Sequence, residues 1–300
     1  MIVTGFHIEP TNICTLKCPG CARTQFIDKW PTHWKNHSLD ISKVMNFLDI
    51  DLTDKHINFC GNYGDPIYHP DFIEMVRAFK ERNTKVSIIT NGSYRNAKWW
   101  DDLCNQLDDR DLIRFSIDGT PENFTQYRIN ANWPSIEIGI KTCVQRGIKT
   151  EWKYIPFSYN TNSIKQAQEL SENLGMSGFQ ISASDRFDKY TEHLIPVDNL
   201  LGKRFTNQQE FKQGLKQSVD PECYQGKSYF ITATGHFAPC CYVADHRFYY
   251  KTDFGKNSKL YDISNSTFSE LTDRPTVINF YQTILQDPAT VCQFNCPKTK

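Results

Sequence analysis

The N-terminal part of the chain alternates short apolar runs with longer amphipathic stretches. Short apolar runs bounded by turn residues are typical of buried β-strands. We therefore expect strands near residues 6–8, 57–59, 86–90, 113–117, 150–154 and 179–181. Helices are expected between them, near 41–48, 97–107, 136–146 and 164–174. A further helix is expected to begin at Pro70 and to carry Phe72, Val76 and Phe79 on one face.

Strands that alternate with helices predict an α/β fold with a parallel sheet built of βα units. Six such units are too few for the complete eight-stranded barrel. From about Pro196 this alternation stops and the composition becomes polar. We therefore expect a first domain over 1–195, a linker or helix over 196–220, and a smaller second domain over 221–300.

Composition excludes several classes of protein. The formal net charge is zero, so no overall field favours nucleic acid or an anionic membrane. No apolar run approaches the roughly 20 residues that a membrane helix needs. Eleven cysteines are many for this length, and no charged and apolar leader precedes the first of them, Cys14. Because cysteine-rich cytosolic proteins more often bind metals than form disulfides, we expect a cytoplasmic metalloprotein.

Three cysteines lie close together directly after the first expected strand. Cys14, Cys18 and Cys21 have the spacing Cys-x3-Cys-x2-Cys, which allows three thiolates on one loop to converge on one metal centre. A closed structural zinc site requires four ligands. An iron–sulfur cube held by three thiolates would keep one iron open for a substrate or cofactor. The spacing alone leaves open a zinc site with a distant fourth ligand, or three unrelated cysteines.

Polar residues also follow the next three expected strands. The second strand is followed by 60–66 (CGNYGDP), the third by 90–92 (TNG), and the fourth ends in 116–119 (SIDG), with Arg128 further on. Active sites of parallel barrels form at the carboxyl ends of the strands. Alternation predicts that Ser116 and Asp118 share one face of their strand. Taken singly, these segments are also compatible with ordinary turns and a solvated cation.

Together, the cysteine loop and these strand ends resemble the radical S-adenosylmethionine (SAM) enzymes. The resemblance implies a partial (β/α)6 TIM-like barrel, and a [4Fe–4S] cluster on Cys14, Cys18 and Cys21 that binds SAM. Most members carry an aromatic residue just before the third cysteine, where this chain has Gly20. The packing of the SAM adenine would then come from elsewhere.

The resemblance also implies roles for residues at the strand ends. Asn62, Gly64 and Asp65 match the segment that meets the amino group of SAM, although that segment more often carries a double glycine and a different acid. Asn91 lies in a turn that the family often shows. Ser116 and Asp118 match the strand that contacts the ribose, and Arg128 is similar to an arginine that can meet the SAM carboxylate.

A second cysteine group lies near the end of the chain. Cys223, Cys240, Cys241, Cys292 and Cys296 resemble the auxiliary domain called twitch, a shorter relative of SPASM. In that domain a hairpin and a helix present four thiolates. In this chain we expect the hairpin near 229–232, turning at Gly235, and the helix near 276–285. The resemblance implies a second [4Fe–4S] cluster on Cys223, Cys240, Cys292 and Cys296, with Cys241 as a spare. A four-cysteine zinc site uses the same ligand type.

The resemblance implies an enzyme that cleaves SAM reductively to a 5′-deoxyadenosyl radical, which removes hydrogen from a substrate. A peptide or protein side chain is the expected substrate, and a small molecule of the sugar or cyclitol type is the alternative. A third possibility is a non-catalytic zinc or iron–sulfur module. The enzyme would need a one-electron reductant such as flavodoxin or ferredoxin.

Overall fold

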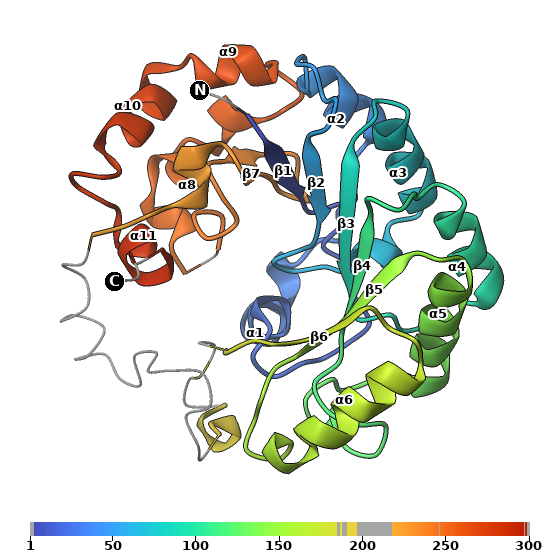
Figure 1. Ribbon diagram of the computed structural model, residues 1–300. Helices are drawn as coiled ribbons and strands as arrows, with labels where there is room; N and C mark the ends of the chain where they lie inside the picture. Colours follow the sequence, from blue (N-terminus) through green and yellow to red (C-terminus); the bar gives the residue numbers. More distant parts are fainter. Residues whose placement is uncertain are drawn as a thin grey trace.

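The computed structural model describes residues 3–184, 187, 191–196, 218–245, 247–296 and 298. Within these residues, eight strands form one curved sheet in the order β6-β5-β4-β3-β2-β1-β7-β8 (Figure 1). The strands are β1 (Gly5–Ile8), β2 (His56–Phe59), β3 (Lys85–Thr90), β4 (Leu112–Ser116), β5 (Lys149–Tyr154), β6 (Gly178–Ile181), β7 (Tyr229–Ile231) and β8 (Phe237–Ala238). The six strands expected from the sequence are all present.

Neighbouring strands from β1 to β6 pair in parallel, and helices connect them. The α-helices of this part are α1 (Ala22–Lys29), α2 (Ile41–Phe47), α3 (Phe72–Lys80), α4 (Ala97–Cys104), α5 (Trp133–Gln145) and α6 (Ile164–Asn173). Short 3-10 helices are η1 (Pro31–His33), η2 (Pro66–Tyr68), η3 (Phe124–Gln126), η4 (Thr161–Ser163) and η5 (Glu192–Leu194). This arrangement is the expected partial (β/α)6 barrel.

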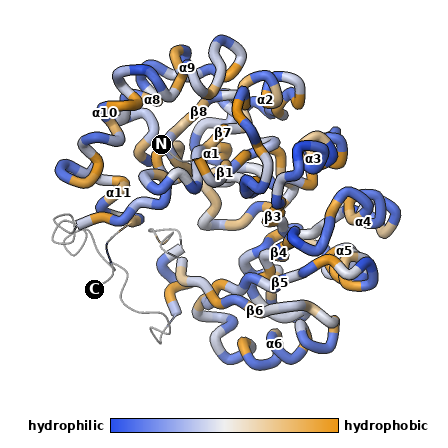
Figure 2. The backbone as a smooth tube through the Cα atoms, turned by 45° about the horizontal axis from the view of Figure 1, so that its top comes forward, coloured by the Kyte–Doolittle hydropathy of each residue, from blue (hydrophilic) through white to orange (hydrophobic). Residues whose placement is uncertain are grey.

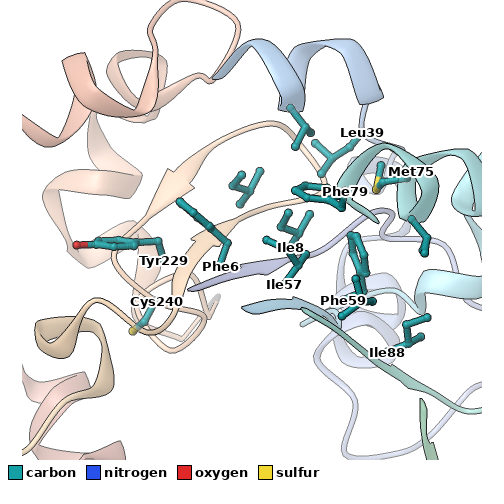
Figure 3. Close-up of a cluster of buried hydrophobic side chains, with 14 of the residues drawn as sticks. Phe6, Ile8, Leu39, Ile57, Phe59, Met75, Phe79, Ile88, Tyr229 and Cys240 are labelled. Carbon is teal, nitrogen blue, oxygen red and sulfur yellow. The ribbon is translucent and has the colours of Figure 1, made fainter. Parts of the chain in front are cut away.

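The two faces of the sheet differ in polarity because residues alternate along each strand. Phe6, Ile57 and Ile88 point to the helix-covered face, where they belong to one buried cluster with residues of α2 and α3 (Figure 3). The intervening positions, such as His7 and Asn58, lie on the opposite, concave face. Figure 2 shows orange apolar segments alternating with blue polar ones along the helices that surround the sheet. The polar concave face therefore remains for ligands.

Two helix boundaries differ from expectation. Helix α3 begins at Phe72 rather than at Pro70, because Asp71 is the non-helical residue before the helix (φ −107°, ψ 37°) and its backbone N–H donates to the His69 ring at 3.1 Å. Its apolar face was predicted correctly, since Phe72, Val76 and Phe79 are all buried. Helix α1 was not expected at all. It buries only Ala22 and therefore carries no apolar stripe for a sequence pattern to reveal.

The C-terminal region contains the expected hairpin and helix. Strands β7 and β8 are antiparallel, and Gly235 turns the chain between them with φ +77°. The expected helix near 276–285 is α10 (Pro275–Thr283), and the other elements are η6 (Glu222–Gln225), η7 (Tyr249–Lys251), α8 (Asp253–Lys256), η8 (Ser258–Tyr261), α9 (Phe268–Thr272) and α11 (Thr290–Asn295). The expected linker over 196–220 falls mostly on residues 197–217, outside the described residues.

The hairpin extends the barrel sheet instead of forming a separate one. Strand β7 pairs in parallel with β1, with Phe6 opposite Tyr229. The Phe268 ring lies 5.1 Å from the rings of both Phe6 and Tyr229, so the cores of the two parts are continuous. The division of the chain into two domains remains a prediction. The pairing fixes the C-terminal cysteines beside β1, as the positions of Tyr229 and Cys240 show in Figure 3.

Candidate active site

A cavity of about 630 Å³ lies at the carboxyl ends of the parallel strands. It is lined by all three cysteines of the N-terminal loop and by residues that follow β2, β3 and β4. Residues from β5, from beyond β6 and from the C-terminal region complete the wall. Among the expected site residues, the lining includes Cys14, Cys18, Cys21, Asn62, Gly64, Asp65, Asn91, Ser116 and Arg128. The structure therefore brings together most of the residues that the sequence indicated.

The cysteine loop is anchored by two buried polar residues that precede it. Thr11 donates its hydroxyl to the His37 carbonyl oxygen at 2.8 Å. The Asn12 side chain accepts from the His37 backbone N–H at 2.8 Å and donates to the Lys35 carbonyl oxygen at 2.9 Å. Because Thr11 and Asn12 are both hydrogen-bonded to the segment 35–37, the cysteine loop leaves β1 in a defined direction towards the cavity.

The loop thiols lie in a setting that favours a bound cation. Burial raises the pKa of the Cys14 thiol, and it raises that of Cys18 to about 12, although nearby Arg128 opposes the shift at Cys18. Thiolates at such positions need a positive partner, which a metal centre supplies. The Asn91 amide donates to the Cys14 sulfur at 3.6 Å and can orient that ligand.

The distances between possible ligand side chains decide whether a single metal ion can be held. Within the described part of the chain, no three thiol, imidazole or carboxylate groups gather closely enough to hold one metal ion. A cubane cluster is larger than a single ion and spreads its thiolates further apart. Iron–sulfur clusters and zinc ions both use thiolate ligands.

The loop after β2 is held against the cysteine loop by close backbone contact. A Cβ at Gly64 would clash with the Thr11 carbonyl oxygen, so this position requires glycine. The buried Glu9 carboxylate accepts hydrogen bonds from the backbone N–H groups of Tyr63 at 2.7 Å and Gly64 at 3.2 Å. Its other oxygen accepts from the Ala233 N–H at 3.3 Å. Glu9 thus joins β1, the 60–66 loop and the C-terminal hairpin.

Asp65 lies in the cavity wall and is held by the end of β3. Its carboxylate accepts from the Thr90 hydroxyl at 2.8 Å, and from the Asn91 backbone and side-chain nitrogens at 2.6 Å each. Burial raises its pKa to about 6, against the lowering effect of these hydrogen bonds. Asp65 and Asn91 therefore form one rigid polar unit beside Cys14.

The fourth strand end departs from expectation. Ser116 lines the cavity, but the Asp118 side chain is fully buried and is not part of the wall. One carboxylate oxygen of Asp118 accepts from Arg128 Nε at 2.6 Å, and the other accepts from the Ile155 backbone N–H at 2.9 Å. The expected contact of Asp118 with a ribose stays a prediction, and in the structure both carboxylate oxygens already accept hydrogen bonds from the protein. Asp118 fixes Arg128, whose side chain lines the cavity near Cys18.

The C-terminal region contributes to the same cavity. Tyr242 and Asn295 line it, and the Asn62 side chain donates to the Cys241 carbonyl oxygen at 2.9 Å. Cys241, three residues after the end of β8, is thus tied directly to the 60–66 loop. The cavity wall therefore includes both the barrel and the cysteine-rich C-terminal region.

Four of the five C-terminal cysteines face one another. Cys223 lies on η6, Cys240 follows β8, Cys292 lies on α11, and Cys296 is the residue directly after that helix. The Cys240 thiol and burial raise the pKa of Cys223, and the pKa of Cys292 and of Cys296 is raised to about 12, mainly by burial. Cys241 instead packs beside the buried residues Phe230, Ala238 and Ala244.

Sequence reasoning missed three residues. Glu9 follows the first strand directly and could have been found by asking what lies at that strand's end. Cys60, the first residue of the 60–66 segment, also lines the cavity. Lys153 lies next to the last residue of β5 and also lines the cavity. Its place in a period-two pattern, between the buried residues Trp152 and Tyr154, was a signal for the concave face.

The fold and the site define an α/β partial barrel with a cysteine-lined cavity at the carboxyl ends of its parallel strands. Residues 8–172 match the Radical SAM superfamily. Because this span covers more than half of the chain, the chain belongs to the Radical SAM superfamily. Enzymes of this superfamily use a [4Fe–4S] cluster and SAM, and they need an electron donor and a substrate.

A curated relative supports this assignment. The chain is 28% identical over 121 residues to the "Tungsten-containing aldehyde ferredoxin oxidoreductase cofactor-modifying protein" of Pyrococcus furiosus. The match covers 38% of this chain and about a third (31%) of the relative.

Solved structures of similar fold cover nearly the whole chain. Native anSMEcpe with bound AdoMet, another name for SAM, has a TM-score of 0.63 and 13% identity, and covers 97% of this chain and 89% of its own. SuiB of Streptococcus suis bound to S-adenosylmethionine has a TM-score of 0.58 and 12% identity, with 97% and 77% covered. BtrN in complex with AdoMet and 2-DOIA has a TM-score of 0.51 and 13% identity, with 100% and 94% covered. No helix among the described residues is long and apolar enough to cross a membrane.

Proposed function

We propose that this enzyme cleaves SAM reductively in the cavity and removes a hydrogen atom from a peptide or protein side chain. One observation carries the proposal: a single cavity is lined by the three loop thiols, by the polar ends of β2 to β5, and by Tyr242 and Asn295. When bound, the cluster and SAM supply a carbon-centred radical that abstracts hydrogen. The protein supplies binding, orientation and shielding from water.

Different residues of the cavity bind different parts of SAM and the cluster. Cys14, Cys18 and Cys21 hold the cluster. Asn62, Gly64 and Asp65 meet the amino group, since carbonyl oxygens and a carboxylate are suitable partners for an ammonium. Asn91 positions Asp65 and Cys14. Ser116 takes the ribose, and Arg128, oriented by Asp118, takes the SAM carboxylate.

The C-terminal cysteines hold a second, auxiliary [4Fe–4S] cluster of the twitch type. Cys223, Cys240, Cys292 and Cys296 supply four ligands, which leaves no open iron. The Asn62 side chain donates to the Cys241 carbonyl oxygen, so a hydrogen bond joins the loop after β8 to the proposed SAM-binding loop after β2. Such a cluster can accept or pass electrons and can orient the wall of the substrate site.

Two features support the substrate class. One solved structure of similar fold, with a TM-score of 0.59 and 14% identity, contains anSMEcpe with AdoMet and a peptide called Cp18Cys. A cavity of about 630 Å³ falls within the ordinary range for one ligand site, so beside SAM it leaves room for a side chain rather than a folded segment. A small molecule is the second candidate, since BtrN, of similar fold, was solved with 2-DOIA.

We further propose that flavodoxin or ferredoxin supplies the electron and that the enzyme works in the cytoplasm. None of the described cysteines is in a disulfide, which fits a reducing compartment. Replacing a chemical reductant by reduced flavodoxin or ferredoxin tests the donor. If adding reduced flavodoxin or ferredoxin forms no more 5′-deoxyadenosine than a reaction without any reductant, these proteins are not the electron donor.

The central experiment compares iron content and SAM cleavage after anaerobic reconstitution. We expect roughly eight irons in the wild type and roughly four in the variant with Cys14→Ala, Cys18→Ala and Cys21→Ala together, with no 5′-deoxyadenosine from that variant. Cys104→Ala is a matched control, since the Cys104 thiol lies 3.6 Å from that of Cys143 in the core. Undiminished 5′-deoxyadenosine formation in the triple variant would rule out the assignment. Mass spectrometry of peptide substrates tests the substrate class.

A further inference from the structure

Lys153 is a charged residue of the cavity wall that the roles above do not use. It lies on β5 directly opposite Ser116 of β4, and both side chains line the cavity. The Lys153 side chain is partly buried. Among the residues that the structure describes, its ammonium group makes no hydrogen bond and no ion pair within 4 Å. A ligand held by Ser116 would therefore lie beside an unpaired cation.

The carboxylates around Lys153 already have other partners. Asp118 binds Arg128 Nε and the Ile155 N–H. Glu151, two residues earlier on β5, binds Arg114 at 2.6 Å. Both carboxylates are thus engaged elsewhere, and neither forms an ion pair with Lys153 within 4 Å.

Burial makes an unpaired ammonium unfavourable. Desolvation lowers the pKa of Lys153 below its usual value; Arg114 and Arg128 act in the same direction, whereas Cys60 and Asp118 oppose the shift. A bound oxyanion would restore the missing partner and would favour the charged lysine. The site is therefore suited to a ligand that brings its own negative charge.

The SAM carboxylate is better placed for Arg128 than for Lys153. Arg128 interacts electrostatically with Cys18, so it lies near the cluster end of the cavity. The neighbours of Lys153 are Cys60, Arg114, Asp118 and Arg128, and none of the three loop cysteines is among them. Because Ser116 is the proposed ribose contact, Lys153 borders the ribose, and the substrate carbon that loses hydrogen to the radical must lie there as well.

We propose that Lys153 binds a carboxylate of the substrate, so that the enzyme acts on a molecule or side chain carrying a carboxylate close to the carbon that loses hydrogen. This inference rests on the proposed function, because it assumes that SAM occupies the cysteine end of the same cavity. Lys153 then sets specificity: an acid is bound, and the corresponding neutral amide is not.

The test is calorimetric titration of the reconstituted, SAM-loaded protein. The probes are succinate against succinamide, and the peptide Gly-Asp-Gly against Gly-Asn-Gly, both peptides with blocked termini. We expect one acid to bind at least tenfold more tightly than its amide. A preference for succinate identifies a free acid as the substrate type, and a preference for the aspartyl peptide identifies a peptide side chain. Equal binding of acid and amide, or no binding of either acid, would overturn the proposal.

Three variants locate the effect. Lys153→Met should lose at least tenfold in affinity for the acid, and Lys153→Arg should recover most of it. Lys149→Met, on an exposed position of the same strand, should bind the acid like the wild type. A tenfold loss of SAM affinity in Lys153→Met would mean that Lys153 binds the SAM carboxylate, which contradicts the inference. A wild-type protein that fails to cleave SAM would instead contradict the proposed function.

Discussion

Arg128 Nε donates to Asp118 Oδ2 at 2.6 Å, and this ion pair lies between the ends of β4 and β5. The Asp118 side chain is completely shielded from solvent, whereas Arg128 lines the cavity. The Asp118 carbonyl oxygen also accepts from the Tyr159 hydroxyl at 2.6 Å and from the Asn160 side chain at 3.0 Å. Asp118 therefore holds the cationic side chain of Arg128 in the wall of the cavity.

A first prediction concerns Glu9. In Glu9→Gln, one of the two oxygens is replaced by an amide donor that cannot accept the N–H groups of the 60–66 loop or of Ala233. We expect a loss of about 1–3 kcal/mol in stability from the unsatisfied buried groups, together with weaker SAM binding. Thermal unfolding and SAM titration measure the two effects. Glu137→Gln, at a residue that pairs with Lys141 on the surface of α5, is the control and should change neither. Unchanged values in Glu9→Gln would show that Glu9 does not hold the loop.

A second prediction separates the adjacent thiols Cys240 and Cys241. Cys240 is buried facing Cys223, and its sulfur accepts from the Val243 N–H at 3.4 Å, whereas Cys241 packs beside Phe230. Cys240→Ser should lose the auxiliary iron, about half of the total if both clusters are cubanes. Cys241→Ser should keep it. Iron analysis after reconstitution distinguishes the two variants. The reverse result would mean that Cys241, and not Cys240, is the cluster ligand.

Much of the barrel was predictable because its signals are local. Each strand from β1 to β6 is a short apolar run between turn residues, and each lies where the pattern placed it. The cysteine loop and the turns after β2 and β3 follow those strands directly, so their convergence needed only the rule that parallel strands end at one edge. Helix α1 lacked such a signal because only Ala22 among its residues is buried.

Non-local relationships could not be predicted in the same way. Alternation placed Ser116 and Asp118 on one face, but β4 ends at Ser116, and beyond that point the period of two no longer applies. The parallel pairing of β7 with β1 joins residues more than two hundred positions apart, and no pattern within either strand specifies it. The contact of Glu9 with Ala233 depends on that pairing.

A third prediction concerns Tyr281, whose buried hydroxyl has no hydrogen-bond partner among the described residues. Burial and the nearby thiols of Cys223 and Cys240 raise its pKa, so it remains a proton donor. A donor to a cluster sulfur stabilises the more negative, reduced state. Tyr281→Phe should therefore lower the potential of the auxiliary cluster, by about 60 mV if the oxidised-to-reduced ratio changes tenfold.

An EPR-monitored redox titration measures this potential in the variant that lacks Cys14, Cys18 and Cys21. Tyr261→Phe is the matched control, because the Tyr261 hydroxyl is bonded to Thr276 at 2.9 Å instead of lying free beside the thiols. A potential that does not move in Tyr281→Phe would place its hydroxyl away from the cluster. Zinc in place of iron would refute the auxiliary cluster itself.

A fourth prediction concerns acid stability. Burial lowers the pKa of His7 to about 4, although the ring nitrogen Nε2 contacts the Cys60 carbonyl oxygen at 3.0 Å. The unfolded chain, with an ordinary histidine pKa near 6.5, binds the proton more readily than the folded one. His7 therefore costs no stability above pH 6.5 and destabilises the fold progressively as the pH falls towards 4, by on the order of 3 kcal/mol.

His7→Gln keeps an amide donor at this position but cannot take up a proton. Thermal unfolding of the metal-free protein at pH 7 and pH 5 should show a smaller loss of Tm for this variant than for the wild type. An identical loss in both proteins would assign the acid sensitivity to other groups.

The last prediction returns to Asp118 and Arg128. If Arg128 binds the SAM carboxylate and Asp118 only fixes Arg128, substitutions of the two residues should have different effects on stability and SAM binding. Arg128→Met leaves the Asp118 carboxylate buried without its cation and removes the contact to SAM, so we expect loss of both stability and SAM binding, about 3–5 kcal/mol for the broken pair. Arg128→Lys keeps a cation but loses the oriented guanidinium and should recover only part of each.

Asp118→Asn retains an oxygen that can accept from either Arg128 Nε or the Ile155 N–H, but not the negative charge. We expect SAM to bind more weakly, with both clusters loaded and with turnover partly restored by excess SAM, because the cation is displaced and not removed. The Kd for SAM, followed through the EPR signal of the reduced cluster, and the 5′-deoxyadenosine rate at saturating SAM measure the two parts. Normal SAM affinity with no product would mean that Asp118 serves the substrate or a proton transfer, contrary to its position behind Arg128.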